Sequence, residues 1–336
     1  MKTAAQAFHV FGVDGGGTKM TGCLLRSDGE LLTMGQAPPA NYSKLRGKIA
    51  QPLVQFLGAL QEQARLPKAR VALAGICSTG VGRPSDRQLL TEALQRAGLA
   101  EKICVDSDAM SALAGAFAGG PGIIVIAGTG AVAYARAPDG NFIRAGGWGY
   151  LIGDEGSGFH LARQALNAAL QAWDGRGAQT SLRQVFEQRF GVHSIELVLS
   201  HIYDPQFDRG QMAALAPIVF EQAAHGDVVA QRIVAETGFE LGRLAGAVLE
   251  KFNHQEVVEI ALLGNLFRRK EVLLPSFWEA LGEAKQRLRV IEPQFEACIG
   301  AVLLALERSG VEKDEEFLAK LRASAQKLLA TGILGI

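Results

Sequence analysis

Residues 12–19 read GVDGGGTK, and their pattern occurs again in outline at residues 126–130, which read IAGTG. A shift of 111 residues superposes the two Gly-Thr pairs and, without a gap, also places Asp28-Gly29 on Asp139-Gly140. Each copy predicts an apolar strand, a glycine turn, a second strand and a hairpin turn. The repetition therefore predicts two related half-molecules that hold one ligand from two sides.

The residue types of the two glycine turns indicate a ligand that carries phosphate. Glycine lets backbone N–H groups approach closely, and Thr18 and Thr129 each add a hydroxyl donor. Asp14 could then face a hydrated magnesium ion. The turn at residues 15–17 is not a Walker A motif, because its glycines lie between two strands instead of leading into a helix. A tight hairpin without a ligand remains the alternative interpretation.

The bulk composition describes a globular chain and excludes several classes of function. The chain has 336 residues, of which 48% are hydrophobic and 20% charged, and its net charge is zero. This length favours two domains, and the neutral charge does not favour a nucleic-acid-binding face. No secretory signal and no membrane-spanning run is evident, so we expect a cytoplasmic protein. The four scattered cysteines favour reduced thiols over disulfides or a zinc site.

The pattern along the chain predicts an α/β fold with two domains. The first half alternates strands with helices until Gly119-Gly120-Pro121-Gly122 interrupts it, which predicts the boundary. The second half restarts with a strand and is then dominated by helices, one of them expected over residues 211–225. An amphipathic helix at residues 313–329 is expected to fold back onto the first domain. We therefore expect one domain of residues 1–120 with about 312–336, and another of residues 121–311.

Asp106-Ser107-Asp108 follows a predicted strand and precedes a predicted helix. Asp and Ser are preferred N-caps, so these residues could simply begin the helix. Alternatively, Asp108 could be a catalytic base at the carboxyl end of a strand, where open α/β sheets bind ligands. A hydroxyl that attacks a phosphoryl group needs such a carboxylate to accept its proton.

Two later segments are candidates for ligand binding. Residues 146–158, GGWGYLIGDEGSG, are too rich in glycine for a core, and Trp148 could line a sugar site or fill the space between the domains. Asp154 could bind ligand hydroxyls or cap the following helix. Residues 261–265, ALLGN, predict a strand that ends in a small turn, where an adenine could bind or where an ordinary turn could lie.

These runs, together with DSDAMSALAGA at residues 106–116, resemble a known family. From Val10 to about Glu307 the chain is similar to the sugar kinases of the acetate kinase–hexokinase–actin–Hsp70 superfamily. It most closely resembles the group of N-acetylglucosamine kinases, glucosamine kinases and BadF/BadG/BcrA/BcrD-type ATPases. The resemblance implies two ribonuclease H-like domains, as in the actin-like ATPases, with an active-site cleft between them.

The resemblance also implies roles for individual residues. Asp108 matches the catalytic aspartate of the family, and the segment from Asp14, the candidate that would reach Mg²⁺ through water, to Lys19 matches its first phosphate loop. The other matching residues form three groups. The phosphate loops would comprise Gly15, Gly16, Gly17, Thr18 and Lys19, and Gly128, Thr129 and Gly130; Gly264 and Asn265 would lie at the adenosine; and the sugar would contact Asn41, Asp108, Gly147, Trp148 and Asp154.

The resemblance implies an ATP-dependent, magnesium-dependent kinase that phosphorylates the 6-hydroxyl of an amino sugar, with N-acetylglucosamine as the first choice. Glucosamine, N-acetylmuramic acid and N-acetylmannosamine remain alternative sugars. An ATPase switch that acts on a partner protein and a non-catalytic sugar sensor are alternative functions. We expect a homodimer that binds neither nucleic acid nor membrane. Ala131 stands where relatives often have serine, and no cysteine lies in a context typical of the iron–sulfur activators of this group.

Overall fold

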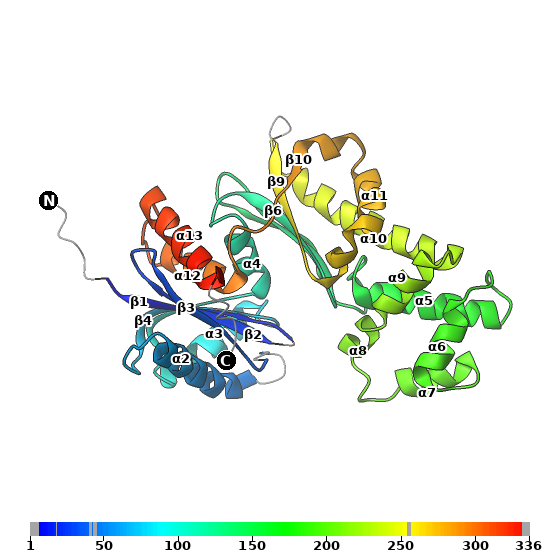
Figure 1. Ribbon diagram of the computed structural model, residues 1–336, viewed down its shortest axis with the longest axis horizontal. Helices are drawn as coiled ribbons and strands as arrows, with labels where there is room; N and C mark the ends of the chain where they lie inside the picture. Colours follow the sequence, from blue (N-terminus) through cyan, green and yellow to red (C-terminus); the bar gives the residue numbers. More distant parts are fainter. Residues whose placement is uncertain (1–6, 18, 40–41, 43–45, 254–256, 331–336) are drawn as a thin grey trace. The chain divides into compact units, whose positions relative to one another are not determined.

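The computed structural model describes residues 7–17, 19–39, 42, 46–253 and 257–330 (Figure 1). The chain divides into two compact units. Unit 1 comprises Met1–Gly120 and Pro293–Ile336, and unit 2 comprises Pro121–Glu292. The second expected domain, residues 121–311, therefore extends further than unit 2, because the helix that follows Pro293 packs on the sheet of unit 1.

The sheet of unit 1 has five strands in the order β3-β2-β1-β4-β5. Strand β1 lies at its centre, antiparallel to β2 and parallel to β4, while β3 extends the antiparallel side and β5 the parallel side. The strands are β1 (His9–Gly15), β2 (Met20–Arg26), β3 (Leu31–Ala37), β4 (Val71–Ser78) and β5 (Ala100–Asp106).

Helices cover both faces of this sheet. Phe11 and Val13 of β1 point into a core shared with α2 and α3, whereas Val10 points into a second core shared with α12 and α13. This alternation follows from the two-residue period of a strand. The helices of unit 1 are the 3-10 helix η1 (Arg46–Ile49), α2 (Ala50–Gln63), α3 (Pro84–Arg96), α4 (Asp108–Ala116), α12 (Ala297–Arg308) and α13 (Glu315–Ala330).

Helix α12 lies with its backbone directly against strand β4 and helix α4. A Cβ atom at Gly75 of β4 would lie 2.0 Å from the carbonyl oxygen of Ala301, and one at Gly300 would lie 1.9 Å from that of Ser111. A Cβ at Gly12 of β1 would meet the carbonyl oxygen of Cys298 at 2.3 Å. Only glycine permits these approaches, so α12 belongs to unit 1.

The sheet of unit 2 repeats the arrangement of unit 1, with the order β10-β9-β6-β7-β8. Strand β6 is central, antiparallel to β7 and parallel to β9. The strands are β6 (Gly122–Ala127), β7 (Ala131–Arg136), β8 (Phe142–Gly146), β9 (Val258–Leu263) and β10 (Leu288–Val290). The two half-molecules predicted from the repeated glycine turn are thus confirmed, as is the α/β class with two ribonuclease H-like folds.

The two hairpin turns correspond bond for bond. In the first, the Gly29 amide donates to the carbonyl oxygen of Arg26 at 2.9 Å; in the second, the Gly140 amide donates to Ala137, also at 2.9 Å. Both glycines have positive φ angles, 94° and 86°. The repeat is less regular before the glycine turns: Gly15 pairs with Met20, whereas Ala127 pairs with Ala131. The first glycine turn is therefore one residue longer than the second.

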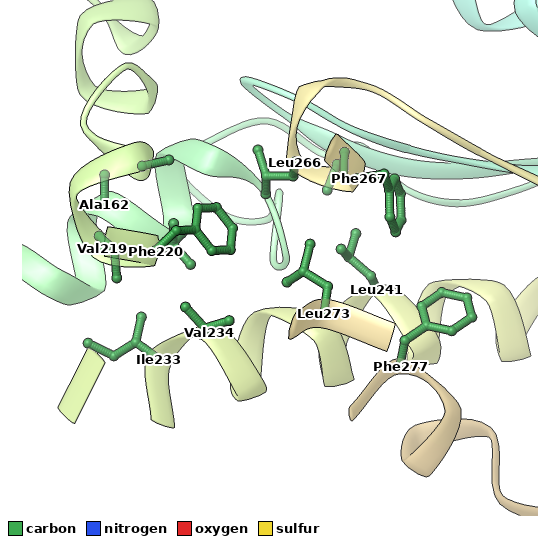
Figure 2. Close-up of a cluster of buried hydrophobic side chains, with 14 of the residues drawn as sticks. Ala162, Val219, Phe220, Ile233, Val234, Leu241, Leu266, Phe267, Leu273 and Phe277 are labelled. Carbon is green, nitrogen blue, oxygen red and sulfur yellow. The ribbon is translucent and has the colours of Figure 1, made fainter. Parts of the chain in front are cut away.

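Helices build most of unit 2 around one core (Figure 2). Figure 2 shows side chains of α5, α9, α10, η3 and α11 pointing toward one another, among them Phe220, Leu241 and Phe277. The elements are α5 (Gly158–Trp173), α6 (Leu182–Phe190), η2 (Ile195–Leu197), α7 (Val198–Ile202), α8 (Arg209–Ala213), α9 (Ala216–Ala224), α10 (Val228–Leu249), η3 (Asn265–Arg269), α11 (Lys270–Leu281) and η4 (Gly282–Arg287). In the described part of the chain, no helix combines the length and apolarity that a membrane crossing needs.

Two helical segments differ from the expectation. The helix expected over residues 211–225 is divided into α8 and α9, because Pro217 occupies the first turn of α9, where its missing N–H is tolerated. Helix α11, for which the sequence analysis made no prediction, contains Pro275. It forms because α10 offers a close surface: Cβ atoms at Gly238 and Gly242 would each lie 2.3 Å from a carbonyl oxygen of α11.

We expect Gly75→Ala to destabilise the protein by at least ~2 kcal/mol, because the added methyl group forces α12 away from the sheet. Gly58→Ala is the matched control. Gly58 lies inside α2 with only ordinary contact around its Cβ position, so that change should stabilise the protein by up to ~1 kcal/mol. Urea unfolding of both variants measures the difference. A Gly75→Ala protein as stable as the wild type would contradict the close packing of α12.

Candidate functional site

In unit 1, the candidate site lies at the carboxyl ends of β1, β4 and β5. Asp14 is partly buried near the end of β1, and its pKa is raised to about 7. Burial is the largest cause, and the nearby carboxylate of Asp108 is the second. Ser111 Oγ lies 3.3 Å from Asp14 Oδ1 and 2.8 Å from the carbonyl oxygen of Asp108, so these two acceptors share its proton. Asp14 and Asp108, which the sequence analysis treated separately, thus lie close together at one edge of the sheet.

Asp108 is the first residue of α4 and keeps its carboxylate available. Its Oδ2 accepts a hydrogen bond of 2.6 Å from the Thr79 hydroxyl, and its Oδ1 accepts one of 3.0 Å from the Ala109 amide. None of the ion pairs among the described residues involves Asp108. Each carboxylate oxygen has a second lone pair, so Asp108 can still accept a proton from a ligand hydroxyl.

Asp106, two residues earlier, has a structural role. Its side chain is 1% exposed and forms ion pairs with Arg308 of α12 and, at 3.2 Å, with Arg87 of α3. Its Oδ1 also accepts a hydrogen bond from the Ser107 amide at 2.8 Å. The N-cap position of α4 is held by Ser107, whose side chain makes no capping hydrogen bond. Because Asp108 also accepts a hydrogen bond from the Ala109 amide in the first turn of α4, the interpretation that it only begins the helix remains the alternative to a catalytic base.

Thr79 and Ser111 were not identified from the sequence, although both contact the Asp14–Asp108 pair. Thr79 directly follows β4, and its amide donates a hydrogen bond of 2.9 Å to the carbonyl oxygen of Gly15. A hydroxyl residue just after the carboxyl end of a central parallel strand was the available signal. Ser111 carried no comparable signal, because a serine one turn into a helix is common.

The first glycine turn is described only in part. Its Gly16 amide donates a hydrogen bond of 3.0 Å to the carbonyl oxygen of Lys19, and Gly17 and Lys19 are exposed. Thr18 and Asn41, which were predicted to contact phosphate and sugar, lie outside the described residues.

The second glycine turn and Gly264 lie together in unit 2. The Gly128 amide donates to the carbonyl oxygen of Gly130 at 2.9 Å, and Thr129 between them is exposed. A Cβ atom at Gly264, whose φ angle is 99°, would lie 2.3 Å from the carbonyl oxygen of Ala127. Gly264 and the exposed Asn265 thus begin η3 beside the end of β6. The structure brings the predicted phosphate and adenosine residues of this unit to one edge of its sheet.

The glycine-rich loop after β8 presents Trp148 to solvent. The indole is 68% exposed, and the flanking Gly146, Gly147 and Gly149 have φ angles of 72°, 69° and 93°. Side chains rarely adopt such angles, which explains why the tryptophan stands among glycines. Leu151 and Ile152 of the same loop are 78% and 83% exposed. Within unit 2, therefore, the loop forms an accessible apolar surface instead of part of the core.

Asp154 lies beneath the second glycine turn. It is 5% exposed, its φ angle is 61°, and its carboxylate accepts hydrogen bonds from the amides of Ala131 and Gly149. Burial raises its pKa, and these hydrogen bonds oppose the rise. A Cβ atom at Gly130 would lie 3.0 Å from Oδ2 of Asp154. The glycine therefore leaves room for this carboxylate. Asp154 thus links the second glycine turn to the loop that carries Trp148.

A magnesium ion fits the residues of unit 1 only as a partly hydrated ion. Among the described residues, no group of three or more His, Cys, Asp or Glu side chains is arranged to hold a metal. Burial first and the carboxylate of Asp108 second raise the pKa of Asp14, and a cation beside it would favour the charged carboxylate against both effects. Mg²⁺ commonly uses one or two carboxylates together with waters and substrate phosphates, which is the set that Asp14 could complete.

The fold and these residues agree with the family comparison. Two five-stranded mixed sheets with the same strand order are the architecture of the actin-like ATPases and their sugar-kinase relatives. The model of the BadF/BadG/BcrA/BcrD ATPase family matches residues 11–305. The chain belongs to this family.

Relatives of known name cover nearly the whole chain. An N-acetylmuramic acid/N-acetylglucosamine kinase of Clostridium acetobutylicum is 30% identical over 300 residues, 88% of this chain and 98% of the relative. An N-acetyl-D-glucosamine kinase of Dictyostelium discoideum is 30% identical over 309 residues, 88% of this chain and 97% of the relative. The crystal structure of a presumed N-acetylglucosamine kinase from Chromobacterium violaceum has a TM-score of 0.74 at 32% identity, over 89% of this chain and 99% of that one.

We expect Asp14→Asn to stabilise the protein at pH 8 by about 1–3 kcal/mol. In the folded state Asp14 keeps its proton up to a pKa of about 7, whereas its ordinary value is 3.8. The unfolded chain releases that proton first, so the contribution of Asp14 to stability falls as the pH rises from about 4 to about 7. The gain on substitution should therefore be small at pH 4.5 and full at pH 8.

Asp28→Asn is the control, and we expect it to change the stability of the protein in the opposite direction. Asp28 in the β2–β3 turn accepts hydrogen bonds from Arg26 and Lys320, which hold its pKa below the ordinary value. Its substitution should destabilise the protein at neutral pH and lose that effect in acid. Thermal unfolding of both variants across this pH range measures the two trends. A gain for Asp14→Asn that does not depend on pH would contradict the raised pKa of Asp14.

Proposed function

We propose that the protein is an ATP-dependent kinase that transfers the γ-phosphoryl group to the 6-hydroxyl of an amino sugar, with N-acetylglucosamine as substrate. The observation that carries this proposal is the Asp108 carboxylate. It is oriented by the Thr79 hydroxyl and has no ion-pair partner among the described residues. The named relatives act on amino sugars, which supports the choice of substrate class.

Asp108 would act as the general base. The Thr79 hydroxyl and the Ala109 amide hold its two oxygens, so the remaining lone pairs have defined directions. A sugar hydroxyl within hydrogen-bond reach of one oxygen would lose its proton to Asp108 as it attacks the γ-phosphorus of ATP in line. The two carboxylates would then differ in role, since Asp14 would face the hydrated Mg²⁺ that accompanies ATP.

The two glycine turns would hold the phosphates of ATP. Their backbone amides can approach closely, and Thr129 is exposed and can donate its hydroxyl. Mg²⁺, when bound, would neutralise charge that develops on the phosphate oxygens. Gly264 and Asn265 begin a helical turn beside the second glycine turn, and we propose that the adenosine binds there.

The sugar would contact the loop that carries Trp148. The exposed indole offers a flat apolar face to an acetyl methyl group, while Gly147 supplies backbone groups. Asp154, buried beneath the loop, would keep the loop in register with the phosphate turn. Asn41 and Thr18 are carried into the proposal from the family resemblance. We also propose a cytoplasmic homodimer, which light scattering can test.

A coupled assay of ADP release tests the reaction class. We expect the rate of ADP release with N-acetylglucosamine to be at least ~10²-fold higher than the rate without sugar. Phosphorus NMR of the product should locate the phosphate on O6. Glucosamine, N-acetylmuramic acid and N-acetylmannosamine complete the panel. ADP release that no sugar stimulates would contradict the kinase proposal and favour an ATPase switch.

We expect Asp108→Asn to lower kcat by at least ~10² and to leave sugar binding nearly unchanged, because the amide keeps the shape and one acceptor oxygen. Asp106→Asn is the matched control, since Asp106 is buried in ion pairs with Arg87 and Arg308. Asp106→Asn should mainly lower the thermal midpoint of unfolding. The kcat of the protein that remains folded should change little. Steady-state kinetics and calorimetric binding separate the two effects. An Asp108→Asn enzyme with near wild-type kcat would show that Asp108 only begins α4.

A further inference from the structure

Arg144 of β8 holds the loop that carries Trp148. Its Nε donates a hydrogen bond of 3.0 Å to the carbonyl oxygen of Gly146, and its Nη2 donates to that of Gly147. Its guanidinium carbon lies 4.9 Å from the centre of the Trp148 ring and 5.9 Å from that of Tyr134. Among the described residues, no carboxylate pairs with Arg144. A full positive charge therefore lies uncompensated against one face of the exposed indole.

The backbone that precedes Trp148 is fixed from its other sides as well. A Cβ atom at Gly146 would lie 2.6 Å from Leu244 Cδ2, and one at Gly147 would lie 2.9 Å from Val132 Cγ2. With the arginine fork on the two carbonyl oxygens, the chain has little freedom up to Trp148. Because the guanidinium occupies one face of the indole, the opposite face is the one left for a ligand.

We propose that Arg144 is a positioning residue that makes the enzyme selective for N-acylated amino sugars over free amino sugars. This inference rests on the proposed function. Stacking with the guanidinium would hold the indole in the orientation that contacts an acetyl group. It would thereby lower the entropy cost of ordering the indole when the sugar binds. The same positive charge would repel the ammonium group that a free amino sugar carries at neutral pH.

Two substitutions separate stacking from charge. Arg144→Met removes both, whereas Arg144→Lys keeps the charge but loses the planar fork and the stacking. Arg136→Met is the matched control: Arg136 of β7 lies 5.5 Å from the centre of the Phe142 ring on the same hairpin. Because Arg136 stacks on Phe142 and not on Trp148, its substitution should leave sugar selectivity unchanged.

The decisive quantity is the ratio of kcat/KM for N-acetylglucosamine to kcat/KM for glucosamine at pH 7. We expect Arg144→Met to lower this ratio by about ten-fold, through a higher KM for the acetylated sugar and a lower KM for the free amine. Arg144→Lys should lower it by about three-fold, because the charge remains. A ratio in Arg144→Met equal to that of the wild type and of Arg136→Met would overturn the proposal.

Tryptophan fluorescence gives a readout that does not depend on turnover. We expect acrylamide to quench Trp148 more strongly in Arg144→Met than in the wild type, with the Trp148→Phe forms of both proteins as blanks for the other indoles. Equal quenching would overturn the positioning role even if selectivity changed. A wild-type protein that phosphorylates no amino sugar would contradict the proposed function instead, and quenching would then decide the role of Arg144 by itself.

Discussion

The contact of helix α12 with glycines of β1, β4 and α4 is the constraint on which unit 1 depends. No side chain separates the helix backbone from Gly75, so α12 sits at a fixed depth on the sheet. At that depth Arg308, in the last turn of α12, reaches the buried carboxylate of Asp106. This ion pair holds the end of β5, and Gly300 holds α4 against the same helix. The position of Asp108 therefore follows from the packing of α12 against the sheet and against α4.

The same edge of the sheet concentrates negative charge. Asp14 lies partly buried near Asp108, and the shared Ser111 proton offsets only part of their repulsion. Such crowding costs stability in the absence of a cation, as expected where function and stability compete. In unit 2, Asp154 has the contrasting arrangement: it is also buried, but backbone amides satisfy it and connect the glycine turn with the loop that carries Trp148.

Local patterns in the sequence predicted the duplicated sheets, the two glycine turns and the family, because each depends on residues close together in the chain. Contacts between distant residues could not be predicted in this way. Thr79 meets Asp108 across 29 residues, and Arg308 meets Asp106 across 202. Helix α11 forms despite Pro275 because Gly238 and Gly242 let it lie on α10. The assignment of α12 to unit 1 likewise depends on its contact with Gly75. That contact joins residues far apart in the chain and appears only in the structure.

A single-turnover experiment with ATP labelled in the γ-phosphate tests the central claim, that Asp108 activates a sugar hydroxyl, most directly. Enzyme in excess is mixed with labelled ATP, Mg²⁺ and N-acetylglucosamine, quenched over time, and the label is separated into sugar phosphate, inorganic phosphate and ATP. The account predicts that label moves into sugar phosphate in the wild type, and that Asp108→Asn binds ATP equally well but transfers label at least ~10² more slowly. Label that appears as inorganic phosphate at the same rate with and without sugar would contradict it.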